Sequence, residues 1–158
     1  TFFKLSTNDK DKKIITNLID DSQSIIINEE LPQFSITDYA QTNHAISDVI
    51  RDQNTFLFFW SPEFVSESYI VSRFQYLSKT YPNIKFIEIK INGDKNKRIQ
   101  KLDIKNQFYL ADNSAAHEFL TCKMPRSILV DKNGKVVNGY ASISSNNLTP
   151  FLNELNKN

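Results

Sequence analysis

The chain has 158 residues, of which 40% are hydrophobic and 12% aromatic, enough for one compact domain with a substantial core and a short extension. Its 19 basic and 18 acidic residues give a net charge of +1 without a long run of one sign, which argues against nucleic-acid binding. The single cysteine, Cys122, excludes an internal disulfide, and no apolar run is long enough to span a membrane.

An N-terminal lead-in over residues 1–30 precedes the main pattern. We expect Asn8 or Asp9 to cap a helix in this lead-in. Its apolar face comprises Ile14, Ile15, Leu18 and Ile19. Because the chain begins with Thr1 and its first residues do not resemble a signal peptide, we expect that an N-terminal portion has been removed, and with it any targeting information. The predicted organisation is an N-terminal helical extension followed by one domain over residues 31–158.

The main domain alternates predicted strands and helices. The expected strands are 33–37 at a sheet edge, 55–60 as a fully buried strand, 84–91 as a central strand, and 127–130. The expected helices are 46–51, 66–80, 95–102, 114–120 and 147–155. Asn133-Gly134 predicts a hairpin turn into a strand over 135–140. This alternation predicts an α/β sandwich with helices on both faces of a mixed sheet.

Four segments stand in a fixed order along this domain. They read Leu-Pro-Gln-Phe-Ser-Ile-Thr-Asp at 31–38, Ile-Ser-Asp-Val at 46–49, Phe-Leu-Phe-Phe-Trp at 56–60 and Met-Pro-Arg-Ser-Ile-Leu-Val-Asp-Lys-Asn-Gly-Lys-Val at 124–136. In this order they resemble the motifs of TlpA-like thioredoxins, an extracytoplasmic branch of thiol-disulfide oxidoreductases. Residues 107–110 resemble the small extra strand of that branch. The resemblance covers about residues 31–156 and implies a thioredoxin-like α/β/α sandwich.

The resemblance also implies an active site directly after Phe59-Trp60, where such proteins carry Cys-x-x-Cys. The two cysteine positions fall on Phe64 and Glu67, or, in an alignment shifted by one residue, on Glu63 and Ser66. Neither register supplies a thiol. Disulfide exchange needs one thiolate to attack and a second thiol to resolve the mixed disulfide, and a serine hydroxyl does neither. We therefore predict a degenerate active-site motif without redox exchange.

Pro125 matches the position of the family's cis-proline, beside which extended substrates pair with the main chain. We expect this edge to hold a peptide by strand addition without any chemistry. The predicted recognition surface consists of Trp60, Phe64, Met124, Pro125 and Arg126.

The leading interpretation is a redox-inactive thioredoxin-like domain that serves as a protein-binding or structural module in the cell envelope, with a periplasmic location implied by the resemblance only. One alternative is a single-cysteine thiol oxidoreductase in which Lys123 lowers the pKa of Cys122. Another is an accessory subunit of a larger envelope complex that docks through residues 1–30. His44 and His117 lack metal-ligand spacing, so we expect no metal and no cofactor. The expected partner is a protein.

Overall fold

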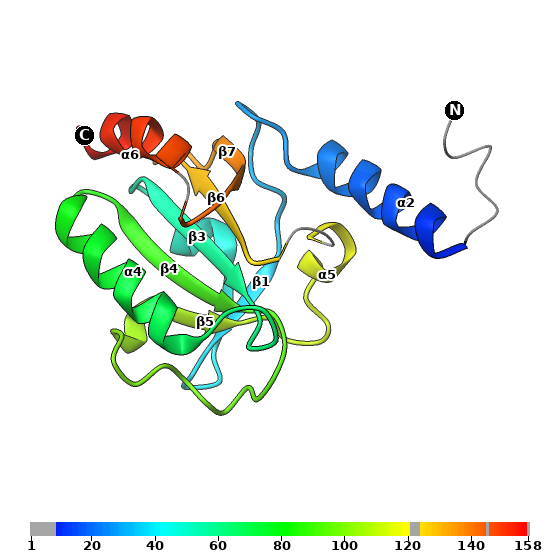
Figure 1. Ribbon diagram of the computed structural model, residues 1–158, viewed down its shortest axis with the longest axis horizontal. Coiled ribbons are helices and arrows are strands. Elements are labelled where there is room, and N and C mark those ends of the chain that lie inside the picture. The colour runs from blue at the N-terminus through cyan, green and yellow to red at the C-terminus, as the bar shows by residue number, and fades with distance from the viewer. Residues whose placement is uncertain (1–8, 121–123, 145, 158) are drawn as a thin grey trace.

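The computed structural model describes residues 9–120, 124–144 and 146–157, and it places helices on both faces of a mixed sheet (Figure 1). Its strands are β1 (Ser35–Asp38), β2 (Asn43–Ala45), β3 (Thr55–Trp60), β4 (Lys85–Lys90), β5 (Gln107–Tyr109), β6 (Arg126–Val130) and β7 (Val136–Ala141). Its α-helices are α2 (Asp9–Ser24), α3 (Ile46–Val49), α4 (Glu67–Thr80), α5 (Ala116–Phe119) and α6 (Thr149–Asn156), and its short 3-10 helices are η1 (Ile104–Asn106) and η2 (Asn146–Leu148). The predicted α/β class with a short N-terminal helix is confirmed.

The described strands form one sheet in the order β2-β1-β5-β4-β3-β6-β7. Strand β4 is parallel to both of its neighbours, β3 and β5. The other neighbouring strands are antiparallel. Every residue of β3 is buried, which confirms the strand predicted from an uninterrupted apolar run.

Each face of the sheet has its own core, because successive side chains of a strand point to opposite faces. On one face, Phe56, Phe58 and Trp60 pack with α4 and α6. On the other, Leu57 and Phe59 pack with α3, α5 and residues 25–34. The two cores hold β3 at the centre of the sandwich.

The hairpin predicted from Asn133-Gly134 joins β6 to β7 and is confirmed. Gly134 has φ 81, in the left-handed region that favours glycine. The Asp131 carboxylate accepts hydrogen bonds from the amides of Asn133 at 2.9 Å and Lys135 at 3.0 Å. Asp131 thus fixes the turn that returns the chain to the sheet.

The edge position predicted for residues 33–37 is wrong. Strand β1 lies between β5 and β2, and β2 forms the edge. The turn between β1 and β2 contains Gln41 at φ 69, and the Asp38 carboxylate accepts the amides of Ala40 and Thr42, each at 2.9 Å. A strand of three residues is too short to show an alternating pattern, so β2 cannot be predicted from periodicity.

The helix predicted over residues 95–102 is also wrong, because this segment consists of turns and bends. Side chains satisfy its main chain instead of helical hydrogen bonds. Nε2 of the Gln107 side chain donates to the main-chain carbonyls of Ile99 at 2.8 Å and Leu102 at 2.9 Å. Its Oε1 accepts from the main-chain amide of Ile99 at 2.8 Å. Lys90 Nζ donates to the carbonyl of Asp94 at 2.8 Å. These partners on β4 and β5 override the local helical preference of the segment.

The end of α2 is anchored in the sandwich by a buried ion pair, while the start of the helix extends away from the sheet (Figure 1). Arg126 Nη1 lies 2.7 Å and 2.5 Å from the two carboxylate oxygens of Asp21, and both residues are buried. Arg126 also donates from Nε to the Gly139 carbonyl at 2.7 Å. The guanidinium stacks 4.2 Å from the ring centre of Tyr140, whose hydroxyl donates to Asp21 at 3.0 Å.

Close packing strengthens this anchor. A side chain at Gly139 would place its Cβ 2.7 Å from Cγ2 of Ile25, closer than real contacts allow. Gly139 therefore lets the segment that follows α2 lie directly on β7. In consequence, the lead-in joins the core of the main domain before residue 30.

We predict that Asp21→Ala lowers the free energy of unfolding by about 3–5 kcal/mol, because it leaves the Arg126 guanidinium buried without a counter-charge. Urea denaturation measures this loss. The matched control is Asp48→Ala, which breaks an exposed ion pair with Arg51 at 2.6 Å and should cost less than about 1 kcal/mol. Equal losses in the two variants would contradict the prediction.

Candidate functional site

The segments that flank the candidate site meet where β3 ends and β6 begins. Strand β3 is antiparallel to β6, with Phe59 opposite Arg126. The loop after β3 and the Met124–Pro125 dipeptide before β6 therefore lie beside each other, and the Met124–Pro125 peptide bond is cis. We call this surface, formed by residues 61–66 with Met124 and Pro125, the proline edge. Ligands of open α/β sheets bind at such strand ends.

A tight turn presents Phe64 to solvent. Ser61 is buried, its hydroxyl lies 2.5 Å from the side-chain oxygen of Asn92, and its carbonyl accepts the Phe64 amide at 3.0 Å. Ser66 then caps α4 by accepting the Tyr69 amide at 3.3 Å. Between these two fixed points the Phe64 side chain is 62% exposed.

The proline edge contains only part of the recognition surface predicted from the sequence. Phe64 and Pro125 are exposed, and Met124 is half-buried. Trp60 and Arg126 are both buried, so the prediction that their side chains contact a partner is wrong. Trp60 ends a fully buried strand and faces the α4 core, whereas Arg126 is held by its ion pair at the end of α2.

The positions of the degenerate motif lie around the start of α4. Glu63 and Ser66 are exposed, and Glu67, the first residue of α4, is half-buried. An acidic residue in the first turn of a helix is electrostatically favourable. Cys122 and Lys123 lie outside the residues that the structure describes.

Sequence reasoning missed a buried polar layer beneath the proline edge, on the α4 face of the sheet. Glu88 is 1% exposed and accepts a hydrogen bond from Nε1 of Trp60, while its other oxygen has no partner among the described residues. Burial raises the pKa of Glu88 to about 8, although the Trp60 hydrogen bond and the charge of Lys90 oppose the rise. The available signal was the presence of Glu88 and Lys90 near the end of a predicted central strand.

Lys90 lies next to Glu88 on the same face. Its ammonium group donates to the carbonyls of Asp94, at 2.8 Å, and Lys97, and it lies 5.8 Å from the Trp60 ring centre and 5.7 Å from that of Tyr39. Burial lowers the pKa of Lys90 and raises the pKa of the Tyr39 hydroxyl, which has no hydrogen-bond partner within the described segments. The layer thus ties the sheet to the segment after β4.

Neither histidine takes part in the proline edge. His44 Nε2 lies 2.7 Å from the Asp38 carboxylate, and its hydrogen bond lowers the pKa of Asp38. His117 Nε2 lies 3.0 Å from the Ala111 carbonyl oxygen. No three His, Cys, Asp or Glu side chains in the described ranges are placed to hold a metal ion.

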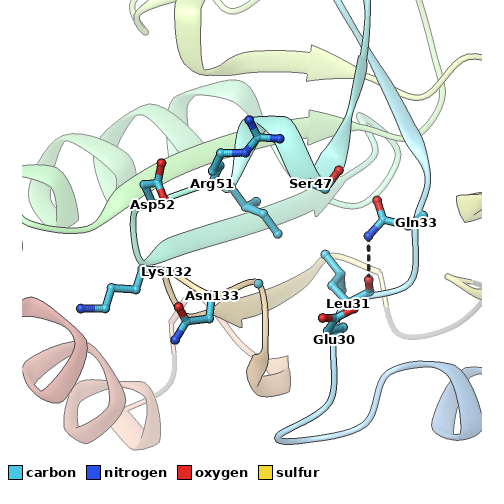
Figure 2. Close-up of a pocket in the computed structure, with 10 residues that line it drawn as sticks. Glu30, Leu31, Gln33, Ser47, Arg51, Asp52, Lys132 and Asn133 are labelled. Atoms are coloured by element: carbon cyan, nitrogen blue, oxygen red, sulfur yellow. Dashed lines mark hydrogen bonds between the residues drawn. The ribbon is translucent and has the colours of Figure 1, made fainter.

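A cavity of about 360 Å³ lies at the other end of β3, between α3 and the β6–β7 turn (Figure 2). Its lining mixes acidic and basic side chains, with Glu30 and Asp52 beside Arg51 and Lys132. Arg51 already pairs with a neighbouring aspartate at 2.6 Å. This mixed lining does not select for a ligand of either charge, so the cavity is a weaker candidate site than the proline edge.

No protein-family model matches the chain, and no curated protein matches it. Solved structures do match it. One, described as a thiol-disulfide oxidoreductase from Bacteroides vulgatus, is 18% identical, with a TM-score of 0.67 over 85% of this chain and 99% of that chain. Another, described as the thiol:disulfide interchange protein DsbE from Chlorobium tepidum, is 14% identical, with a TM-score of 0.64 over 84% and 99%.

A third match is a domain from Cytophaga hutchinsonii described as a thiol-disulfide isomerase. It is 17% identical, with a TM-score of 0.64 over 84% of this chain and 95% of that chain. The TM-scores establish the fold, whereas identities this low leave the activity open. The chain therefore has a thioredoxin-like fold, the fold of the thiol-disulfide oxidoreductases that it matches in structure.

Proposed function

We propose that this chain is a redox-inactive thioredoxin-like module that binds an extended segment of another protein at the proline edge. The observation that carries the proposal is the exposed Phe64 on the turn before α4, where the resemblance to thioredoxins implies a cysteine. These 158 residues contain one cysteine, and dithiol exchange needs two. The edge thus offers an apolar contact in place of a reactive pair.

The main chain of the proline edge supports a binding role. Neither the amide nor the carbonyl of Met124 has a hydrogen-bond partner in the described part of the chain. Main-chain amides and carbonyls are stabilised by hydrogen bonds, and an extended peptide supplies such bonds by strand addition. Phe64 and Pro125 provide exposed apolar surface beside these groups. Affinity would come from the main chain and selectivity from the aromatic contact.

We predict that the alkylated B chain of insulin, an extended polypeptide without free thiols, binds at the proline edge. In a titration followed by NMR, the amide resonances of residues 61–66 and Met124 should shift. Phe64→Ser should weaken binding about tenfold, because one aromatic contact of this kind contributes about 1.4 kcal/mol.

The matched control is Tyr76→Ser, which removes an aromatic side chain of α4 that is 57% exposed and outside the proline edge. It should leave the affinity unchanged, as should Cys122→Ser, because the alkylated probe forms no disulfide. Shifts confined to other surfaces, or equal losses for Phe64→Ser and Tyr76→Ser, would refute the binding site.

The second candidate function is a thiol oxidoreductase that uses Cys122 alone, and the position of Cys122 two residues before Met124 in the sequence favours it. Such an enzyme attacks a disulfide with the Cys122 thiolate and needs an outside thiol to release the mixed disulfide. An accelerated alkylation of Cys122 together with an activity that Cys122→Ser abolishes would favour this function over the module.

We further propose that the module works in the cell envelope, as the resemblance to the TlpA-like branch implies, and takes part in a larger assembly. The exposed side chains of Ile14, Leu18 and Ile19 on α2 support a place in an assembly, because they leave an apolar helix face uncovered. None of the described helices has the length and apolar composition to cross a bilayer.

The polar layer supports a structural task for Glu88. A side chain that is 1% exposed beneath the proline edge does not reach a bound segment. Its charged form is disfavoured by burial, so the carboxyl group is protonated in the folded chain at pH values where it is ionised in the unfolded chain. Folding therefore depends on pH through this residue.

We predict that the free energy of unfolding falls as pH rises from about 4.5, the ordinary pKa, to about 8, the pKa of folded Glu88. Across this window the folded state holds a proton that the unfolded state has released, so each pH unit costs up to about 1.4 kcal/mol. Glu88→Gln keeps an acceptor for Trp60 and should remove most of this slope in urea denaturation.

The matched control for this prediction is Glu154→Gln, which removes an exposed carboxylate paired with Lys157 at 3.0 Å. It should retain the slope of the native chain. A Glu88→Gln variant with an unchanged slope would show that Glu88 is ionised in the folded state and would contradict its assigned role.

A further inference from the structure

A cavity of about 620 Å³ lies between the first half of α4 and residues 97–101, the segment that forms turns in place of the predicted helix. Its volume is within the range of ligand sites. It shares no residue with the proline edge. We call this cavity the basic groove, and the lining residues that matter here are Ser68, Val71, Lys97, Arg98, Ile99 and Lys101.

The floor of the basic groove is apolar. Val71 is half-buried on α4, and Ile99 is 2% exposed on the opposite wall. Both belong to the packing of the α4 core. Because Ile99 is already covered by the core, an aliphatic side chain placed here would contact the half-buried side chain of Val71.

The rim of the basic groove is positively charged. Lys97 and Lys101 are exposed, and Arg98 is half-buried. Across the described residues, no carboxylate lies within salt-bridge distance of these three side chains. Glu67 is the acidic residue of the lining, so the cations outnumber it. A chain with a net charge of +1 thus concentrates positive charge here, which attracts an anionic ligand.

The wall that carries these cations is held in place from below. Gln107 makes three hydrogen bonds to the main chain of Ile99 and Leu102, each at 2.8 or 2.9 Å, and Lys90 donates to the Lys97 carbonyl. These donors and acceptors come from buried strands. The groove is therefore preorganised, which lowers the entropic cost of binding.

We propose that the basic groove binds an acidic segment of a partner protein. One aliphatic side chain of that segment lies on Val71, and carboxylates on either side of it face Lys97, Arg98 and Lys101. This contact is separate from the proline edge and gives the module a second selectivity for the sequence of its partner.

The test uses a short serine-rich peptide with one leucine between two glutamates, titrated into the isotope-labelled chain and followed by NMR. The amide resonances of Ser68, Val71 and residues 97–101 should shift. A peptide with glutamine in place of both glutamates, and another with serine in place of leucine, should each bind at least about tenfold more weakly, since one charge contact or one aliphatic contact contributes about 1.4 kcal/mol.

The variant Lys97→Glu/Lys101→Glu should weaken binding of the acidic peptide by more than about tenfold. Its matched control is Lys132→Glu/Lys135→Glu, which changes net charge equally at the β6–β7 turn, away from the groove. Equal losses in both variants, silent groove resonances, or inorganic phosphate binding as tightly as the peptide would overturn the proposal. Binding at the proline edge is followed through different resonances, so either site can fail alone.

Discussion

The buried ion pair between Asp21 and Arg126 connects the parts of this protein that matter for its proposed function. Arg126 opens β6 directly after Pro125, and Asp21 lies near the end of α2. The same guanidinium also holds the Gly139 carbonyl in β7. The ion pair is buried, so its stability depends on these hydrogen bonds, although Nη2 of Arg126 has no hydrogen-bond partner among the described residues. The lead-in helix, the last strand and the proline edge therefore share one fixed point.

The polar groups on β4 and on the segment after it are of two kinds, buried and exposed. Glu88 and Lys90 are buried under the proline edge, where Glu88 accepts a hydrogen bond from Trp60 and Lys90 connects the sheet to the segment after β4. Lys97 and Lys101, on that same segment, face solvent. The buried polar groups support the fold, whereas the exposed cations are available for the proposed partner. The thioredoxin-like scaffold thus positions two surfaces without a dithiol between them.

Prediction from sequence succeeded where local pattern and burial agree. The uninterrupted apolar run of β3, the amphipathic spacing of α4 and the Asn133-Gly134 turn each specified their element. It failed where a side chain finds a distant partner. Arg126 reads as a surface cation, but its partner stands 105 residues away, and the Trp60 partner stands 28 residues away. The Gln107 side chain, only eight residues from Ile99 in sequence, forms hydrogen bonds with the main chain where a helix was expected over residues 95–102.

We propose that this chain keeps the thioredoxin-like arrangement of the loop after β3 beside the start of β6 and lacks the two thiols that dithiol exchange needs. The direct measurement is insulin reduction by the native chain and by Phe64→Cys/Glu67→Cys in a Cys122→Ser background, each with dithiothreitol. We expect no turnover for the native chain above the reagent alone and clear turnover for the variant, whose new thiols stand at the start of α4. Turnover by the native chain, or an inactive variant that folds normally, would contradict it.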